Sequence, residues 1–304
     1  MKELYGITVA MVTPFDSNGQ VDYVGVAQLT RMLVDKGVNC LYPCGTTGEM
    51  LRLSLAERKE VARTVVKAAD HQVSVFIHCG CMNQEDTIEL LRSAREDGAD
   101  GAGVVTPVFF HANDRELEEY YAAVAAAVPD FPIYLYGIPQ CASNDLSANV
   151  AQRIANRCKN VIGIKYSFAD INRTIDYTYI NQGNFSVLHG CDRALIGMLA
   201  LGCKGTVSGI AGVFPEPFVA AYKAYLEGDL GRAQQIQKTC VKLVDALRGG
   251  SNMSYFKEAL KMRGIPGGMM RRPQLDLPAA EVEELREILT TICAEAGIQM
   301  ELQR

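Results

Sequence analysis

Short apolar runs alternate with longer amphipathic segments along most of this chain. Eight of the runs predict buried strands, because aliphatic residues dominate each one and Gly, Pro or polar residues bound it. Their starts are mostly separated by about 25 to 35 residues, the length of a strand–helix unit. The strands are expected at residues 7–12, 40–42, 73–78, 101–106, 133–136, 161–165, 185–188 and 205–208.

Helical periodicity marks the segments between the strands. In the first segment, Val26, Leu29 and Leu33 share one face of a helix that ends at Gly37. Two later helices are predicted at residues 86–97 and 114–127, each with an acidic N-cap. After about residue 215 the strand pattern stops, and further helices are predicted at residues 217–227, 230–247, 255–262 and 279–296.

Eight strand–helix units with no change of composition midway predict the α/β class and a closed (β/α)8 TIM barrel. We expect the barrel to occupy residues 1–225. Residues 226–304 are expected to form a C-terminal helical extension, packed on the barrel or on a partner subunit. A doubly wound dinucleotide-binding sheet is excluded, because Thr13-Pro14-Phe15 follows the first strand where Gly-x-Gly-x-x-Gly is required.

Composition narrows the classes of protein that fit. The chain has 304 residues, 48% hydrophobic and 21% charged, which suits a compact protein with a large core. The net charge of -5 argues against a nucleic-acid partner. No apolar stretch reaches the roughly 18 residues that a membrane span needs, and the N-terminus lacks a signal-peptide core. We therefore expect a cytoplasmic protein with no membrane partner.

The ten cysteines predict reduced thiols rather than disulfides or a metal site. Most lie inside apolar runs, where a thiol behaves as a small hydrophobic group. The segment His78-Cys79-Gly80-Cys81 has no second pair of ligands at zinc spacing. No metal is expected.

Candidate catalytic groups follow from the barrel, since its active site is formed at the carboxyl ends of the strands. Lys165 ends a strongly apolar run. A lysine in such surroundings can become a nucleophilic amine, although it can also simply mark the point where a strand reaches water. Tyr136 ends the preceding strand, about 4.8 Å away, so its phenol can shuttle protons for that amine. Tyr134, one pleat lower, is expected to pack in the core.

A second candidate is the turn Gly45-Thr46-Thr47-Gly48-Glu49 after the second strand. Its N–H groups and hydroxyls can hold a carboxylate, although an ordinary glycine-rich turn explains the pattern too. The aromatic pair Phe109 and Phe110 follows the fourth strand and suits an interface, a pocket wall or plain packing. A phosphate-binding barrel is disfavoured, because Gly190-Cys191-Asp192 places an acid where the phosphate loop belongs.

Taken together, these residues resemble the dihydrodipicolinate synthase/N-acetylneuraminate lyase family of class I, pyruvate-dependent lyases and aldolases. The resemblance covers nearly the whole chain. It is carried by Thr13-Pro14-Phe15, Gly45-Thr46-Thr47-Gly48-Glu49, Thr106-Pro107, Tyr136-Gly137-Ile138-Pro139, Gly163-Ile164-Lys165, Gly205-Thr206-Val207-Ser208 and the segment 257–264.

The resemblance implies a role for each matching residue. Lys165 would form a Schiff base with the 2-oxo group of pyruvate or of a pyruvate-derived 2-oxo acid, and Tyr136 would be the general acid/base. Thr46 and Thr47 would bind the substrate carboxylate, with Thr47 also on the proton relay. Val207, through its backbone, and Ser208 would contact the substrate. The family resemblance further implies no cofactor, an aldehyde as a possible second substrate, and a homotetramer built from tight dimers.

The chain also departs from both main branches of the family. Phe109 stands where the synthase branch has a relay tyrosine, and Gln140-Cys141 stands where that branch has a carboxylate-binding arginine. Tyr166-Ser167-Phe168 after the lysine does not match the sialic-acid lyase branch. We expect a polar distal pocket suited to a hydroxylated aldehyde, and a 2-oxo sugar-acid aldolase or dehydratase as the subclass. Its lining is predicted to include Ser143, Asn144, Ser167, His189, Asp192 and Ser208.

Two alternatives stay open at this point. The chain can be a true 4-hydroxy-tetrahydrodipicolinate synthase or N-acetylneuraminate lyase, or a catalytically weak barrel that binds and regulates through a 2-oxo acid. Phe109 keeps the last alternative open, because it has no hydroxyl to pass a proton. We also expect thiol reagents to label Cys44 or Cys141, with protection by pyruvate, unless these thiols are buried and inert.

Overall fold

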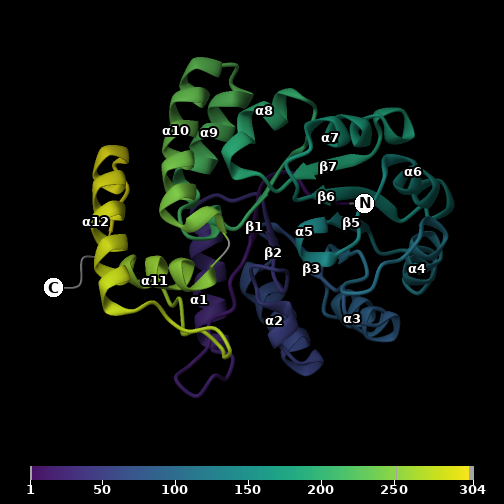
Figure 1. The fold of residues 1–304 in the computed structure, drawn as a ribbon, viewed down its shortest axis with the longest axis horizontal. Helices are drawn as coiled ribbons and strands as arrows, with labels where there is room; N and C mark the ends of the chain where they lie inside the picture. The colour runs from purple at the N-terminus through teal and green to yellow at the C-terminus, as the bar shows by residue number, and fades with distance from the viewer. Residues whose placement is uncertain (1, 251, 301–304) are drawn as a thin grey trace.

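The computed structural model of the protein describes residues 2–250 and 252–300. Eight parallel strands close into a barrel in chain order, β1 pairing with both β2 and β8 (Figure 1). The predicted TIM barrel is confirmed, and no predicted strand end differs from the structure by more than two residues. The strands are β1 (Gly6–Ala10), β2 (Cys40–Tyr42), β3 (Ser74–His78), β4 (Gly101–Val105), β5 (Ile133–Gly137), β6 (Val161–Tyr166), β7 (Ser186–His189) and β8 (Gly205–Ser208).

The helices that follow the strands form the outer ring of the barrel. They are α1 (Tyr23–Asp35), α2 (Leu55–Ala69), α3 (Gln84–Glu96), α4 (Asp114–Ala126), α6 (Ala148–Arg157), α7 (Ile171–Thr178), α8 (Leu195–Ala200) and α9 (Pro215–Leu226), with the short α5 (Pro139–Ala142) following β5.

The predicted acidic N-caps of α3 and α4 are wrong. Asn83 and Asn113 cap these helices, each accepting a hydrogen bond from a backbone N–H in the first turn. The acidic residues Asp86 and Asp114 lie inside the first turn instead, where negative charge favours the helix dipole. Asparagine is as good a cap as aspartate, so the nearby acids do not mark the first residue of a helix.

Three helices follow the barrel: α10 (Leu230–Ala246), α11 (Met253–Met262) and α12 (Ala279–Ala296). Figure 1 shows them gathered on one side, with α12 furthest from the strands. α10 packs along α9, and α12 packs on α10 and α11. Leu243 and Leu285, from α10 and α12, belong to the same apolar cluster as the strand residue Leu41. The extension is therefore packed on the barrel, which is one of the two arrangements expected from the sequence, the other being packing on a partner subunit.

The amino-terminal half of the barrel interior is filled by side chains. Tyr42, Phe76, Tyr134 and Leu188 form a buried cluster there. The Tyr134 hydroxyl accepts a hydrogen bond from the Leu4 N–H at 3.0 Å, which confirms its expected place in the core. This packing closes one end of the barrel.

No helix within residues 2–250 and 252–300 has both the length and the apolar character needed to cross a bilayer.

Candidate active site

A cavity of about 800 Å3 lies at the carboxyl ends of the barrel strands. Its floor includes Tyr136 and Lys165, the residues near the ends of β5 and β6, and Val207 from β8. Phe256 and Met270 reach the same cavity from the C-terminal extension. Catalytic groups of TIM barrels gather at this end, so this cavity is the candidate active site.

Tyr136 and Lys165 face each other across β5 and β6, where they are register partners. Lys165 Nζ lies 4.0 Å from the centre of the Tyr136 ring and 4.8 Å from that of Tyr42. The lysine is buried. Within residues 2–250 and 252–300, no carboxylate lies within 4.0 Å of its amine. The amine therefore sits between two aromatic faces and can approach a carbonyl carbon in the cavity.

The Tyr136 hydroxyl is within hydrogen-bond distance of one threonine of the predicted carboxylate turn. Its Oη lies 3.2 Å from Thr46 Oγ1. Thr47 lies against Gly209, after β8, and lines the cavity from the other side. The sequence analysis placed Thr47 on the proton relay, whereas the hydroxyl that reaches Tyr136 in the structure belongs to Thr46.

The turn itself is closely held. Thr13 Oγ1 donates to the Gly48 carbonyl at 2.8 Å, and the Glu49 N–H donates to the Thr46 carbonyl at 3.0 Å. A Cβ at Gly48 would lie 3.0 Å from a backbone nitrogen of Cys44, so this position needs glycine. Both threonines are thus presented to the cavity by an ordered turn rather than by a loose loop.

Val207 and Ser208 end β8 but occupy different places. Val207 lines the cavity. Ser208 is fully buried, and its Oγ accepts a hydrogen bond from the Ala211 N–H at 2.9 Å. The serine hydroxyl therefore caps the turn after β8, and its predicted contact with substrate stays a prediction.

The structure agrees with the predicted polar distal pocket only in part. Of its six residues, only Ser167 and Asp192 line the cavity. The Asn144 side chain donates to the carbonyls of Pro107 and Phe110 and so holds the loop after β4. Position in the chain does not reveal this, because a buried polar side chain commonly satisfies backbone groups instead of facing a ligand.

Burial raises the pKa of the Asp192 carboxyl to about 7. The Thr206 hydroxyl donates to it at 3.5 Å, and hydrogen bonds of this kind work in the opposite direction. Asp192 can consequently either accept or donate a hydrogen bond near neutral pH.

Sequence reasoning missed an apolar wall of the cavity. Met50, Val105, Ile138 and Ala142 form a buried cluster with Tyr136, separate from the main core. All of them line the cavity, which Ser167 and Asp192 also line. The place of Val105 and Ile138 at strand ends was a usable signal. No such sequence signal marked the cavity residues that the extension contributes, which are Met253, Phe256, Met270 and Leu275.

Phe109 lies in the loop after β4 with its side chain exposed. The exposed fractions of Phe109 and Phe110 are 73% and 76%, and their ring centres are 5.0 Å apart in an edge-to-face arrangement. Val108 lines the cavity immediately before them. Two adjacent exposed aromatic rings at the cavity rim suit an interface.

The cysteines near the site differ in accessibility. Cys44 is buried, and burial raises the pKa of its thiol to about 11, so of the two predicted targets it is the less reactive. Cys141 is exposed and lines the cavity, which also contradicts the alternative that all these thiols are buried. Within residues 2–250 and 252–300, no three His, Cys, Asp or Glu side chains come together as metal ligands.

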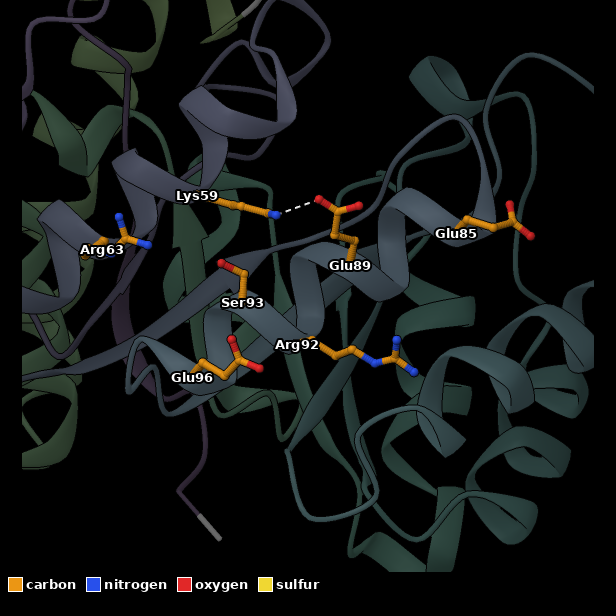
Figure 2. Close-up of a pocket in the computed structure, with 7 residues that line it drawn as sticks. All are labelled: Lys59, Arg63, Glu85, Glu89, Arg92, Ser93 and Glu96. Carbon is orange, nitrogen blue, oxygen red and sulfur yellow. Dashed lines mark hydrogen bonds and ion pairs between the residues drawn. The ribbon is translucent and has the colours of Figure 1, made fainter.

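A second hollow, of about 490 Å3, lies on the outside of the barrel between α2 and α3 (Figure 2). Its side chains pair with their neighbours: Lys59 contacts Glu89 at 2.5 Å, and Arg63 contacts Glu60 and Asp97. Such exposed pairs are typical of a solvated helix surface. The chemistry belongs to the cavity at the strand ends.

Comparison with known proteins agrees with this site. Residues 3–292 match the model of the dihydrodipicolinate synthetase family. The chain is 35% identical over 288 residues to a 4-hydroxy-tetrahydrodipicolinate synthase from Methanothrix thermoacetophila, covering 94% of this chain and 96% of that protein.

Solved structures of similar fold have related activities. The dihydrodipicolinate synthase of Aquifex aeolicus superposes with a TM-score of 0.90 at 33% identity, over 95% of this chain and 98% of that one. A Ruminococcus gnavus sialic acid aldolase with a mutated catalytic lysine superposes with a TM-score of 0.91 at 26% identity, over 98% and 99% of the two chains. The chain thus belongs to the dihydrodipicolinate synthetase family and is a lyase of that family.

Proposed function

We propose that Lys165 forms a Schiff base with pyruvate or with a pyruvate-derived 2-oxo acid, and that the enzyme makes or breaks a bond next to that carbon. One observation carries the proposal: the buried Lys165 amine lies 4.0 Å from the Tyr136 ring, whose hydroxyl is 3.2 Å from Thr46. A catalytic lysine is also named for the similar sialic acid aldolase, and a similar structure was solved in complex with pyruvate.

The first half of the reaction needs a nucleophile and a proton shuttle. The Lys165 amine adds to the 2-oxo carbon, which becomes a carbinolamine. The carbinolamine oxygen takes up a proton and leaves as water, while the nitrogen lone pair forms a double bond to the same carbon. Tyr136 supplies and recovers protons in these steps, and Thr46 connects its hydroxyl to the cavity.

The second half uses the protonated imine as an electron sink. In a 4-hydroxy-2-oxo acid, the 4-hydroxyl gives its proton to a base and becomes the carbonyl of the departing aldehyde, while the electron pair of the broken C3–C4 bond passes into the enamine. In the opposite direction, the enamine of pyruvate attacks an aldehyde. Loss of a hydroxyl from C4 after deprotonation of C3 would give dehydration from the same intermediate.

The carboxylate of the 2-oxo acid is assigned to the turn that carries Thr46 and Thr47. Two hydroxyls and the turn's N–H groups are suitable donors for it, and Val207 lines the adjoining floor. The carboxylate then fixes which carbon faces Lys165.

For the remainder of the substrate, we propose a hydroxylated aldehyde or sugar-acid chain, the subclass favoured by the sequence. Ser167 and Asp192 support it, since both face the cavity and can bond hydroxyls. The apolar wall at Met50 and Ile138 favours carbon over hydroxyl where that chain meets it. Gln140 and Cys141 stand where the synthase branch has a carboxylate-binding arginine, and neither carries a positive charge for a second carboxylate.

We further propose a homotetramer in the cytoplasm. The exposed rings of Phe109 and Phe110 support burial of the loop after β4 against another subunit.

Borohydride reduction in the presence of pyruvate, followed by mass spectrometry of peptides, tests the proposed function. We expect a reduced pyruvate adduct on Lys165 and no adduct in Lys165→Met. The control Lys159→Met replaces an exposed lysine outside the cavity, and its adduct on Lys165 should be unchanged. Pyruvate binding without an adduct would favour the second candidate, a catalytically weak binding barrel, for which Phe109 is the supporting feature.

A further inference from the structure

Lys257 lies in α11, in the C-terminal extension, yet its ammonium group contacts the turn that carries Thr46 and Thr47. Nζ is 2.7 Å from Oε1 of Glu49, the residue that ends this turn. The exposed fractions of the two side chains are 0% and 1%. Taking two charges out of water is costly, and a buried pair is weak evidence of a gain in stability. The pair therefore calls for a role other than stabilising the fold.

Contacts on every side fix the position of the Lys257 ammonium group. It donates to the Met269 carbonyl at 2.7 Å and lies 4.3 Å from the centre of the Phe15 ring. The loop after α11 also packs on the backbone of this residue, because a Cβ at Gly267 would be 2.1 Å from the Lys257 carbonyl oxygen. Lys257 is thus a rigid attachment point rather than a flexible surface lysine.

Glu49 has a backbone conformation that requires support. Its φ is +61°, in the left-handed region that is unfavourable for residues other than glycine. Its second carboxylate oxygen pairs with Arg52. The contact with Lys257 is a 2.7 Å ion pair between two buried charges. This pair holds the end of the turn in place.

A second contact brings α11 to the same turn. Phe256, the neighbour of Lys257, and Thr47 both lie against Gly209, where a Cβ would be 3.1 Å and 3.2 Å from them. Phe256 and Thr47 also both line the cavity. Helix α11 thereby limits where Thr47 can lie.

We propose that Lys257 is a positioning residue for the substrate carboxylate: through Glu49 it fixes the turn that presents Thr46 and Thr47 to a 2-oxo acid at Lys165. The proposal rests on the proposed function, since it presumes that the turn binds this carboxylate. It gives the C-terminal extension a part in substrate binding.

The test compares two carbonyl probes in borohydride trapping at Lys165. Pyruvate carries the carboxylate, and acetone offers the same methyl ketone without it. In Lys257→Met, we expect the pyruvate concentration that gives half-maximal trapping to rise about tenfold or more. This is the effect of losing one charge-assisted hydrogen bond between the displaced turn and the pyruvate carboxylate. Trapping by acetone should stay unchanged. Lys261→Met, a half-buried lysine on the same helix, is the matched control and should change neither probe.

Removing one partner leaves a buried charge, so Lys257→Met can fail to fold for that reason alone. The double variant Glu49→Gln/Lys257→Met removes both charges, and we expect it to fold and still to need more pyruvate. Pyruvate trapping like that of the unmodified protein would overturn the proposal. So would an equal effect on both probes, or failure of the double variant to fold, because the pair would then serve the fold itself.

The proposed function fails by a different result. If the unmodified protein forms no adduct with pyruvate, Lys165 is not the Schiff-base residue, whatever Lys257 does. An adduct that forms equally well in the double variant contradicts only the role of Lys257.

Discussion

The Tyr136 hydroxyl lies 3.2 Å from the hydroxyl of Thr46, and the neighbouring Thr47 lies instead against Gly209. Two adjacent threonines of one turn therefore face different partners. Under the proposed function, Thr46 would pass protons with Tyr136, and Thr47 would hold the substrate.

This difference predicts distinct effects for two isosteric substitutions. Thr46→Val should slow exchange of the pyruvate methyl protons with solvent about 100-fold at saturating pyruvate, because proton transfer loses its relay. Thr47→Val should leave that limiting rate within a few-fold but raise the half-saturating pyruvate concentration. Proton NMR in deuterated water measures both quantities without a second substrate. The reverse pattern would return the relay to Thr47, as the sequence suggested.

Asp192 predicts a pH dependence of stability. Its pKa is raised to about 7, chiefly by burial, so the folded protein holds a proton that the unfolded chain releases near pH 4. The contribution of Asp192 to the free energy of unfolding should therefore fall as pH rises from about 4 to about 7, by at most about 1.4 kcal/mol per pH unit, and level off above.

Urea unfolding of the unmodified protein and of Asp192→Asn at several pH values checks this. The difference in unfolding free energy between the two should change across that pH window, since the amide does not titrate. Asp130→Asn, at an exposed aspartate, serves as control. A difference that is constant with pH would contradict the raised pKa.

The closed end of the barrel predicts a strict requirement for glycine at position 103. A Cβ on Gly103 would lie 1.8 Å from the Tyr42 hydroxyl oxygen and 2.6 Å from Cζ of that ring. Overpacking of this kind costs about 1–3 kcal/mol, so Gly103→Ala should lower the free energy of unfolding by that amount. Gly197→Ala, where nothing lies within 4 Å of the added Cβ, should be neutral or slightly stabilising. Adding Tyr42→Phe to Gly103→Ala should restore part of the loss. A Gly103→Ala variant as stable as the unmodified protein would show that the ring can move aside.

The contacts of the candidate site that the sequence predicted correctly depend on neighbouring strands. Tyr136 and Lys165 end consecutive runs, and consecutive strands of a barrel are always paired. Once the eight units were recognised, contact between these two side chains followed. The Thr46–Thr47 turn was predictable for the same reason, because it directly follows a strand end.

The parts that were missed depend on packing between distant segments. The sequence around Lys257 predicts a helix but does not show whether this lysine is buried or solvated. Only the fold brings it to Glu49. Asn144 was expected to face substrate but satisfies backbone carbonyls of another loop. Polar residues after strands were therefore easy to locate and hard to assign, because backbone groups and ligands compete for the same side chains.

We predict that the reaction of Cys141 with a thiol reagent reports whether a ligand occupies the cavity. This cysteine lies in α5, exposed and at the cavity wall, whereas Cys44 is buried beneath the turn. Because partial burial raises the pKa of the Cys141 thiol, alkylation should be slow at neutral pH and faster toward pH 9. Pyruvate in the cavity should slow inactivation by iodoacetamide several-fold, and Cys141→Ser should abolish inactivation.

Peptide mass spectrometry of the alkylated protein distinguishes the two thiols. We expect the label on Cys141 and none on Cys44 while the protein is folded. Equal alkylation rates with and without pyruvate would place the ligand away from α5, and the assignment of the β5–β6 side of this cavity to the 2-oxo acid would then have to be given up.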